Sequence, residues 1–445
     1  MKKIKQPSVA GTFYTANSKD LKEQITNFAK ENKNQYVIST RTVIVPHAGL
    51  IYSGRLAYEG INQLDKNLKN IFIFAPAHRV GFSGLALTSF DSWETPLGHI
   101  DINQDINKEL ANKFNANFND DAIQPEHSIE VQIPIIQSVF PNIKIIPILI
   151  GRQNPELIEQ IISYYYPNKE NGFIISSDLS HFLSDDEAVK TDSVTAYMIE
   201  TGAVGNFTHE QACGATGIIG LVKFANKNNF SLIRIDMTNS SAVTNDFSSV
   251  VGYGCWFLYE GSKNKFLKEY YSKFIIDICA LTIKSQFIKQ EVHIKYPQVF
   301  SQYGASFVTL EKNNNLRGCI GSIIARKSLI VDLVSNAQNA AFKDPRFNPV
   351  QKEELDTLKI AVSLLSEPKP IDFQDEEDLL NQIKPYQDGI IIQEGNYQAV
   401  YLPSVWEQIP DKKEFLNSLK IKAGLQPDYF SKTFAAYKFT TEYIK

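Results

Sequence analysis

The chain of 445 residues is 43% hydrophobic and 11% aromatic, a composition typical of packed globular structure and not of a disordered protein. A single hydrophobic core seldom extends beyond about 300 residues, so two domains are expected. The 45 basic and 49 acidic residues leave a net charge of −4 without any basic stripe, which argues against a nucleic-acid partner.

Neither a membrane span nor a disulfide framework is expected. No stretch approaches the roughly 18 consecutive apolar residues that a transmembrane helix needs, and no apolar signal segment follows the basic amino terminus. The four cysteines are scattered and form no CxxC pair, which favours a reducing compartment. We therefore expect a cytoplasmic protein without membrane contact.

The first elements in chain order predict βαβ units. Residues 18–28 form a helical pattern behind a capping serine, and the apolar run 42–45 predicts a buried strand. A helical pattern over 53–64 and a second apolar strand over 70–75 follow. This order of strand, helix and strand predicts a mostly parallel central sheet with flanking helices.

The same alternation continues to residue 258. Further helices and strands are expected over residues 105–114, 143–150, 173–177, 185–201, 214–226, 231–236 and 250–258. Pro147 places its strand near a sheet edge or a bulge, because proline cannot donate a hydrogen bond to a neighbouring strand. The first domain is therefore predicted to be α/β.

The sequence turns polar near residues 260–265, and the domain boundary is placed there. The predicted domains are residues 1–262 and 263–445. Beyond the boundary, short strands alternate irregularly with helical patterns such as 329–342 and 415–423. This mixture favours an α+β second domain over a second doubly wound sheet.

Three predicted strands end in residues that can bind a metal or move a proton. His47 follows the first of these strands, His78 the second, and Asp178 with His181 the third. Ligands bind at the carboxyl ends of strands in open α/β sheets, so these ends are expected to converge. Neutral imidazole is the commonest transition-metal ligand, which favours a shared ion at His47 and His78 over two histidines that bond only the backbone.

A third ligand could come from Asp178, His181, His127 or Cys213. Cys213 precedes a predicted helix, whose dipole would favour the thiolate that binds metal or attacks an electrophile, although a small buried thiol is the alternative. Asp178 and His181 could instead relay a proton or orient a ligand, or the aspartate could cap a turn. His209 is expected to be a surface residue.

Six short motifs resemble the Memo family, in order, over roughly residues 6–260. They are Ala10-Gly-Thr-Phe-Tyr-Thr-Ala, Pro46-His-Ala-Gly, Ala75-Pro-Ala-His, Glu126-His-Ser-Ile-Glu, Ser176-Ser-Asp-Leu-Ser-His and Ala212-Cys-Gly. The resemblance implies a fold similar to that of the class III extradiol dioxygenases, which are non-haem iron enzymes. It also implies an iron or copper ion with the ligands His47, His78 and Cys213, and a shared pocket with the catalytic candidates His127, Asp178 and His181.

Cys213 is a departure from the dioxygenases. Those enzymes complete a two-histidine, one-carboxylate triad, whereas the family resembled here offers a cysteine. Thiolate is a softer ligand that favours copper(I) or a more covalent iron site. The resemblance therefore implies a metal site without implying ring-cleaving activity.

Two motifs in the second domain, Leu316-Arg-Gly-Cys-Ile-Gly-Ser and Ala341-Phe-Lys-Asp-Pro-Arg-Phe, carry a charged turn and a charged loop. They predict a site for a small anionic ligand, because guanidinium groups clamp carboxylates and phosphates, although such loops are often internally paired. The candidate residues of this site are Arg317, Cys319, Lys343, Asp344 and Arg346. A nucleophilic Cys319 is weighed against a core thiol, since His293 is the sole histidine in this half of the sequence.

These motifs, together with residues 401–406 and 422–425, resemble the AMMECR family over about residues 265–445. That family has a mixed α+β fold and no settled activity. Memo-like and AMMECR-like proteins are encoded with a radical SAM protein in the AmmeMemoRadiSam system, so the resemblance implies a fusion of two components. The chain lacks a CxxxCxxC cluster, which places the radical SAM component on a separate partner protein.

Three functions are compatible with these residues. The first is a metal-dependent oxidoreductase acting on a small molecule, and the second is a non-catalytic metal- or ligand-binding scaffold for the radical SAM partner. The third is a cysteine hydrolase or transferase that uses Cys213 with His47 or His181 as its base. One cysteine among several strand-end histidines suits coordination better than a catalytic triad, so the metal-binding interpretation is favoured.

Overall fold

The computed structural model describes residues 2–31, 38–288 and 294–445. The chain divides into two compact units, residues 1–262 and residues 263–445. No helix among the described residues is both long and apolar enough to cross a membrane.

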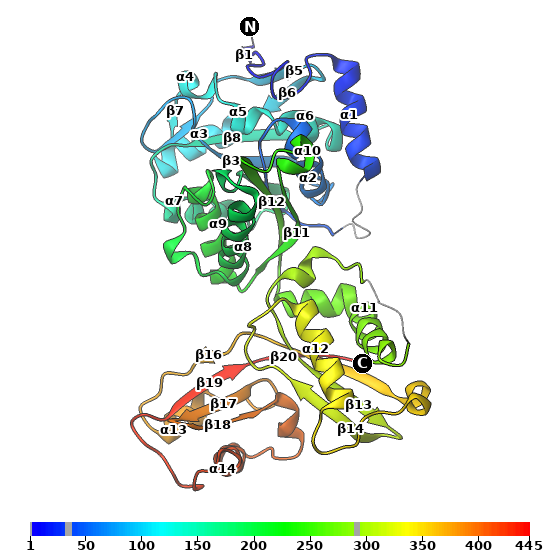
Figure 1. Ribbon diagram of the computed structural model, residues 1–445. Coiled ribbons are helices and arrows are strands. Elements are labelled where there is room, and N and C mark those ends of the chain that lie inside the picture. Colours follow the sequence, from blue (N-terminus) through cyan, green and yellow to red (C-terminus); the bar gives the residue numbers. More distant parts are fainter. Residues whose placement is uncertain (1, 32–37, 289–293) are drawn as a thin grey trace. The chain divides into compact units, whose positions relative to one another are not determined.

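The first unit is built on one twelve-stranded sheet (Figure 1). Its main path runs β1-β5-β6-β8-β3-β9-β2-β12-β10, with β11 beside β12 and with β4 joining β7 to β8. The strands are β1 (Ile4–Lys5), β2 (Thr42–Val45), β3 (Asn70–Pro76), β4 (Leu85–Leu87), β5 (Ser92–Thr95), β6 (Gly98–Ile102), β7 (Asn117–Phe118), β8 (Lys144–Ile150), β9 (Asn171–Ser176), β10 (His181–Leu183), β11 (Ser231–Asn239) and β12 (Val250–Tyr259). The pairings β8–β3, β3–β9 and β9–β2 are parallel, which confirms the predicted mostly parallel sheet.

Helices cover both faces of this sheet (Figure 1). They are α1 (Ser18–Glu31), α2 (Leu50–Asn62), α3 (Gln104–Phe114), α4 (Asp120–Ile123), α5 (His127–Glu130), α6 (Ile133–Val139), α7 (Pro155–Tyr165), α8 (Asp185–Thr201), the 3₁₀ turn η1 (Val204–Asn206), α9 (Ala215–Asn228) and α10 (Ser241–Thr244). Helices α1, α2 and α6 pack together beside β2 and β12, while α9 packs on β3 and β9 and against α7 and α8. The predicted α/β architecture is confirmed.

Burial on both faces explains why the central strands are apolar without alternation. In β3, Ile71, Phe72, Ile73 and Phe74 are all fully buried. Phe72 and Phe74 belong to the core on the α7–α9 side, and neighbouring residues along the strand point to the opposite face. A parallel strand covered by helices on both sides has no solvent face, so its sequence reads as one apolar run.

The prediction that Pro147 marks an edge or a bulge was wrong. Its strand β8 lies inside the sheet, where β3 flanks it along its whole length and Pro147 pairs with Ile73. On the other flank β6 pairs only as far as Ile145 and β4 only from Leu149 onward. Pro147 falls between those two short pairings, so the proline is accommodated in an interior strand.

The second unit has two four-stranded antiparallel sheets, of order β14-β13-β15-β20 and β16-β19-β17-β18. Its strands are β13 (Ala305–Lys312), β14 (Asn315–Gly321), β15 (Lys359–Leu365), β16 (Lys369–Pro370), β17 (Gly389–Glu394), β18 (Tyr397–Tyr401), β19 (Ala435–Phe439) and β20 (Thr441–Ile444). Its helices and 3₁₀ turns are α11 (Lys263–Ser285), η2 (Gln298–Ser301), α12 (Leu329–Phe342), η3 (Lys352–Thr357), α13 (Glu376–Gln382), η4 (Pro403–Glu407) and α14 (Lys412–Ala423).

Each of these sheets carries helices on one face, and a small apolar cluster that includes Ala305, Leu365, Ile391 and Phe439 draws residues from both sheets. Helices α11 and α12 pack on the first sheet, and α14 packs on β17 and β18 of the second. In the second core, the rings of Trp406 and Phe415 stack with their centroids 3.6 Å apart. Short antiparallel strands that carry helices in this way confirm the predicted α+β fold.

Candidate metal centre

The topology of the first sheet brings three strand ends to one edge. Strand β9 lies between β2 and β3 and is parallel to both, with Val45 paired to Ser176. His47 and Asp178 each lie two residues past the ends of their strands, and His78 lies two residues past Pro76, the last residue of β3. The predicted convergence of these ends is confirmed by the strand pairing.

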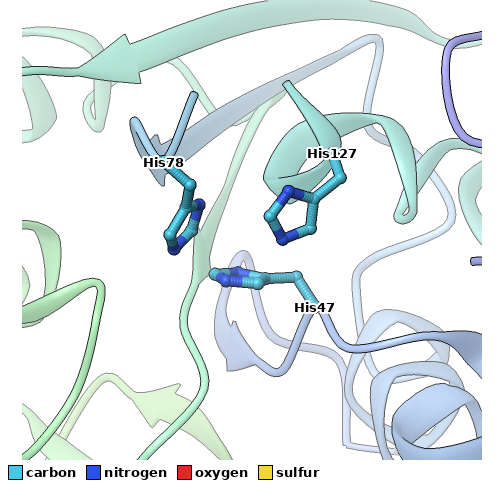
Figure 2. A group of neighbouring side chains, drawn as sticks. All are labelled: His47, His78 and His127. Atoms are coloured by element: carbon cyan, nitrogen blue, oxygen red, sulfur yellow. The ribbon is translucent and has the colours of Figure 1, made fainter. Parts of the chain in front are cut away.

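Three imidazoles meet above this edge, from His47, His78 and His127 (Figure 2). One ligand atom from each residue lies within 4.8 Å of the other two. The ring centroids are 5.2 Å apart for His47 and His78, 5.6 Å for His47 and His127, and 4.8 Å for His78 and His127. His47 is buried, whereas His78 is exposed, so the group can be reached from solvent on the His78 side.

The tautomer of His47 follows from the bonds of Ser176. The Ser176 hydroxyl donates its single proton to the Ser128 carbonyl at 2.8 Å and accepts a bond from Gln132 Nε2 at 2.9 Å. Its remaining contact, at 3.0 Å, is with His47 Nδ1, which must therefore carry the proton. Burial, followed by the nearby charges of His78 and His127, holds the pKa of His47 well below its ordinary value. The ring is neutral, and Nε2 presents a lone pair to the centre.

Glu126 fixes the other two rings. It caps α5, and its carboxylate accepts bonds from the backbone amides of His78, Arg79, His127 and Ser128. One oxygen also lies 3.1 Å from His78 Nδ1 and 3.0 Å from His127 Nδ1. Burial alone would raise the pKa of Glu126, but the contacts with His127 and His78 hold it well below the usual range. His78 thus donates Nδ1–H to the carboxylate and leaves Nε2 free.

Cys213 reaches the cluster because α9 approaches the end of β9 very closely. Its Sγ lies 3.3 Å from His47 Nε2 and accepts a bond from the Asp178 amide at 3.3 Å. Gly214, the N-cap of α9, makes this approach possible, since a Cβ there would lie 2.6 Å from the Cβ of Ser177. The Gly214 amide instead donates to the Ser177 hydroxyl at 2.9 Å.

The prediction that Cys213 is shifted toward thiolate was wrong for the protein without metal. Burial, followed by the charge of Asp178, raises the pKa of the Cys213 thiol to about 12. These effects outweigh the start of α9 and the bonds from the Asp178 and Gly214 amides. A bound cation would supply positive charge beside the thiol and favour the loss of this proton.

Asp178 and His181 border the same centre. The Asp178 carboxylate accepts the His47 amide at 2.7 Å and comes within 4.0 Å of His47 Nε2. Burial raises the pKa of Asp178, and the His47 amide opposes the rise. His181 lies with His78 and Cys213 in the wall of an open cavity of about 660 Å³, which gives a small molecule room beside the cluster.

Sequence reasoning missed Glu126, Ser176 and Gln132, which hold the rings in place. Glu126 stands next to His127 in the sequence, but nothing local indicates that its carboxylate also reaches His78. Ser176 and Gln132 act through bonds between distant segments, which a single sequence does not reveal. The expected exposure of His209 is confirmed, yet its ring also lines the cavity and contacts the Cys213 carbonyl at 3.3 Å.

The predicted anion-site residues of the second unit lie on β14 and on the loop after α12, and most of them are already paired. Arg317 donates two bonds to Glu354, and Arg346 donates two to Asp344. Asp344 also accepts the Cys319 amide at 2.8 Å, and Arg346 binds the Cys319 carbonyl at 3.1 Å.

Two details complete this second site. Lys343 is exposed, and no partner is seen for its ammonium group within the described chain. His293, weighed above as a base for Cys319, lies outside the described residues.

Comparison with known proteins assigns both units. A family model described as Memo-like protein matches residues 5–257, and one described as AMMECR1 matches residues 276–444. A MEMO1 family protein of Thermoplasma volcanium is 33% identical over 260 residues, which are 56% of this chain and 96% of that protein. A MEMO1 family protein of Aquifex aeolicus is 28% identical over 265 residues, again 56% of this chain and 97% of that protein. A crystal structure of an uncharacterized protein from Pyrococcus horikoshii is 33% identical and covers 39% of this chain and 89% of its own, with a TM-score of 0.36.

Proposed function

The chain belongs to the Memo-like family, as its motifs predicted, and we propose that its first unit binds a redox-active iron or copper ion. The ligands would be His47, His78 and Cys213, with His127 as a further nitrogen donor. One observation carries the proposal: the donor atoms of three imidazoles lie within 4.8 Å of one another, with the Cys213 sulfur 3.3 Å from His47 Nε2. Imidazole and thiol are donors that suit iron and copper better than magnesium or calcium.

The residues around the ligands support a chemical role. A bound iron or copper ion would supply electron transfer and Lewis acidity. Asp178 orients His47 through the His47 amide, and its raised pKa suits a group that holds or returns a proton. The proposed reaction is metal-dependent redox chemistry on a small molecule that enters the cavity beside His78 and His181.

Metal analysis after anaerobic purification tests this function. We expect about one equivalent of iron or copper in the wild type and a large loss in Cys213→Ser and in His47→Ala. Cys319→Ser and His99→Ala are matched controls, because they remove a partly exposed thiol of the other unit and an exposed imidazole. A wild type without either metal, or full occupancy in both ligand variants, would sink the proposal.

A cysteine-dependent hydrolase or transferase is the second candidate, favoured by the same contact between Cys213 and His47. A neutral His47 with a free Nε2 is placed to accept the thiol proton. Metal and substrate would then compete for Cys213. Acyl-enzyme formation by the metal-free protein with activated esters, observed by mass spectrometry, would favour this candidate over the metal site.

We propose that the second unit, which the AMMECR1 model matches, binds a small anion. Because Arg317 is tied to Glu354, the exposed Lys343 is expected to contribute more than Arg317. Calorimetric titration with phosphate and with carboxylates should show weaker binding for Lys343→Ala than for Arg317→Ala. Unchanged titrations for both variants would remove this part of the proposal.

A radical SAM protein in the cytoplasm is the proposed partner. The four free cysteines are compatible with a reducing compartment, and the chain carries no CxxxCxxC motif of its own. In the scaffold alternative, this partner performs the chemistry while the chain supplies a metal or a ligand. Affinity purification from the native host under anaerobic conditions, followed by mass spectrometry, should recover a radical SAM protein. Recovery of the chain without a radical SAM protein would count against this proposed partner.

A further inference from the structure

A second open cavity lies next to the imidazole cluster, between the amino-terminal segment and residues 79, 124 and 125. It has a volume of about 590 Å³, within the range of small-molecule sites, and none of its lining residues is acidic. The lining residues are Ser8, Val9, Thr12, Phe13, Arg79, Gln124 and Pro125. Phe13 connects this cavity to the cluster, because its ring packs on His127 with the centroids 4.5 Å apart.

The polar side chains of this wall have protein partners. The Thr12 hydroxyl donates to the Val9 carbonyl at 2.9 Å, and the Ser8 hydroxyl donates to the Gln124 carbonyl. The Gln124 amide nitrogen donates back to the Ser8 hydroxyl at 3.1 Å. Arg79 differs from these residues, since its guanidinium forms no ion pair or hydrogen bond within the described chain.

Three of the four other arginines of this unit are neutralised, whereas the exposed Arg152 shows no partner for its guanidinium within the described chain. Arg41 pairs with Glu260, Arg55 with Glu59 and Asp236, and Arg234 with Glu200. The nearest acidic group to the Arg79 backbone is Glu126, which accepts the Arg79 amide at 3.2 Å. That carboxylate is buried and already engaged by four amides and the His78 imidazole, so it does not neutralise the guanidinium.

We propose that this cavity is a subsite for the anionic group of a small molecule, with Arg79 clamping a carboxylate or phosphate. The apolar walls of Val9, Phe13 and Pro125 would hold the adjoining apolar part of the ligand. A guanidinium offers two parallel N–H groups that match the oxygens of either anion. The inference rests on the proposed function only in placing the reacting end of the ligand at the imidazoles, since anion binding itself requires no metal.

The backbone around Arg79 supports a fixed subsite. Glu126 holds the amides of both His78 and Arg79, at 2.6 and 3.2 Å, so one carboxylate positions a candidate metal ligand and the cation next to it. Pro125 and Gln124, directly before Glu126, line the same cavity. The subsite and the cluster would therefore keep a constant separation, which selects ligands by length.

Titration of the full chain, stripped of metal by a chelator, tests the subsite. The probes are benzoate, its neutral analogue benzamide, and inorganic phosphate, followed by calorimetry or ligand-observed NMR. We expect benzoate to bind and benzamide to bind much more weakly. Arg79→Gln should weaken benzoate binding about tenfold or more, because a charge-assisted bidentate contact is lost, and Arg79→Lys should fall between.

Lys144→Gln is the matched control. Lys144 is exposed and carries the same charge on the same unit, but it starts β8, at the opposite end of the strand from the edge where the imidazoles meet. The Lys144→Gln variant should bind benzoate as the wild type does. If phosphate rather than benzoate responds to Arg79→Gln, the inference stands with a phosphate as the natural group. The inference would be overturned if neither benzoate nor phosphate binds at millimolar concentration, or if Arg79→Gln binds both anions as the wild type does. Equal binding of benzoate and benzamide would also overturn it unless phosphate binding depends on Arg79.

Metal analysis separates this inference from the proposed function. Arg79→Gln should keep the metal content of the wild type, since Arg79 is not a ligand. If the protein holds no metal but binds benzoate through Arg79, the proposed function is excluded and the subsite stands. If the protein holds metal and its anion binding does not depend on Arg79, the proposed function stands and the subsite is excluded.

Discussion

The two candidate sites differ in how far their polar groups are already satisfied. In the first unit, Ser176 and Glu126 bind the outer nitrogens of His47 and His78, while the inner nitrogens face one another. In the second unit, Arg317 and Arg346 are each closed by a carboxylate. The first arrangement is completed by something that accepts several lone pairs at once, whereas the second is complete in itself. A cluster of functional residues in a sequence does not distinguish these two cases.

Charge sharpens this difference. The three imidazoles, with ring centroids 4.8 to 5.6 Å apart, could not all be protonated without repulsion. Burial first, and then the charges of His78 and His127, hold the pKa of His47 well below its ordinary value. The ion pairs of the second unit lower the pKa of their acids instead, and Arg317 with the Gln351 amide brings the pKa of Glu354 to about 2. The first site therefore offers neutral donor atoms to a cation, whereas the carboxylates of the second site are already paired with arginine side chains.

The largest effect should be seen in the reactivity of Cys213. With a pKa of about 12 instead of an ordinary value near 9, its thiolate population at pH 8 is lower by a factor of about 1,000. We predict that iodoacetamide modifies Cys213 of the metal-free protein far more slowly than it modifies the same thiol in urea. The rate should rise about tenfold per pH unit through pH 11, which is still below the pKa of the thiol, as measured by mass spectrometry of the peptide.

This measurement also tests the comparison between the sites. The pH dependence separates protonation from blocked access, because a rate limited by protonation of the thiol rises with pH and a rate limited by access does not. Fast modification at pH 8, equal to that of the unfolded chain, would mean that the folded site stabilises a thiolate without any metal. That result would favour the cysteine-dependent candidate over the metal site.

The next effect concerns the carboxylate that organises the first site. Glu126→Ala would leave four backbone amides and the His78 imidazole without their acceptor, and we expect destabilisation by about 3 kcal/mol or more. Glu126→Gln keeps the shape and one acceptor, so it should fold and bind metal about 10- to 100-fold more weakly. Urea unfolding and a competitive metal titration give the two numbers.

Asp344→Ala is the counterpart in the second unit. It also removes an acid that accepts a backbone amide, but its partner Arg346 is half-exposed and can turn to water. Its cost should stay near 1 kcal/mol. Equal costs for Asp344→Ala and Glu126→Ala would show that the two sites do not differ as described.

Much of the first site could be predicted because the strand ends carry the information. A buried apolar run that stops before His47 or His78 indicates both the strand and its functional end, and parallel neighbours bring such ends together. Glu126 and Ser176 could not be predicted in the same way, since their partners lie 48 to 129 residues away. Hydrogen bonds between distant segments leave no periodic pattern in a sequence.

The errors have the same origin. The prediction for Cys213 used the start of a helix, a local feature, whereas burial among β9 and its neighbours decides the pKa. The prediction for Pro147 used the missing N–H, whereas the short reach of β6 and β4 decides whether that group is needed. In each case a rule that holds for a segment alone was overridden by what packs against it.

A smaller effect should follow loss of the Ser176 hydroxyl. Ser176→Ala removes the acceptor that keeps the proton of His47 on Nδ1, so the ring can take the other tautomer and present N–H to the centre. We predict about tenfold weaker metal binding. Ser180→Ala is the matched control, because Ser180 is equally buried on the following turn and binds Asp192 through its amide.

Nitrogen NMR of His47 in the metal-free protein reads this tautomer directly. The wild type and Ser180→Ala should show a protonated Nδ1, and Ser176→Ala should show a mixture. If the signals of His47 stay the same in Ser176→Ala, the hydroxyl does not set the tautomer, whatever happens to the metal affinity.

The smallest effect should come from breaking the ion pairs of the candidate anion site in the second unit. Glu354 binds both Arg317 and Lys312, so Glu354→Gln would release two cations without removing any. We predict two- to fivefold tighter binding of sulfate to the full chain, since exposed charge pairs contribute only about 1 kcal/mol. Because the folded pKa of Glu354 is about 2, below its unfolded value near 4.3, the carboxylate stays charged in the folded chain as the pH falls from 7 to 4. The affinity ratio between variant and wild type should therefore be the same at pH 7 and pH 4. Sulfate keeps its charge over that range, so a ratio that falls to one by pH 4 would mean that Arg317 does not hold Glu354 ionised.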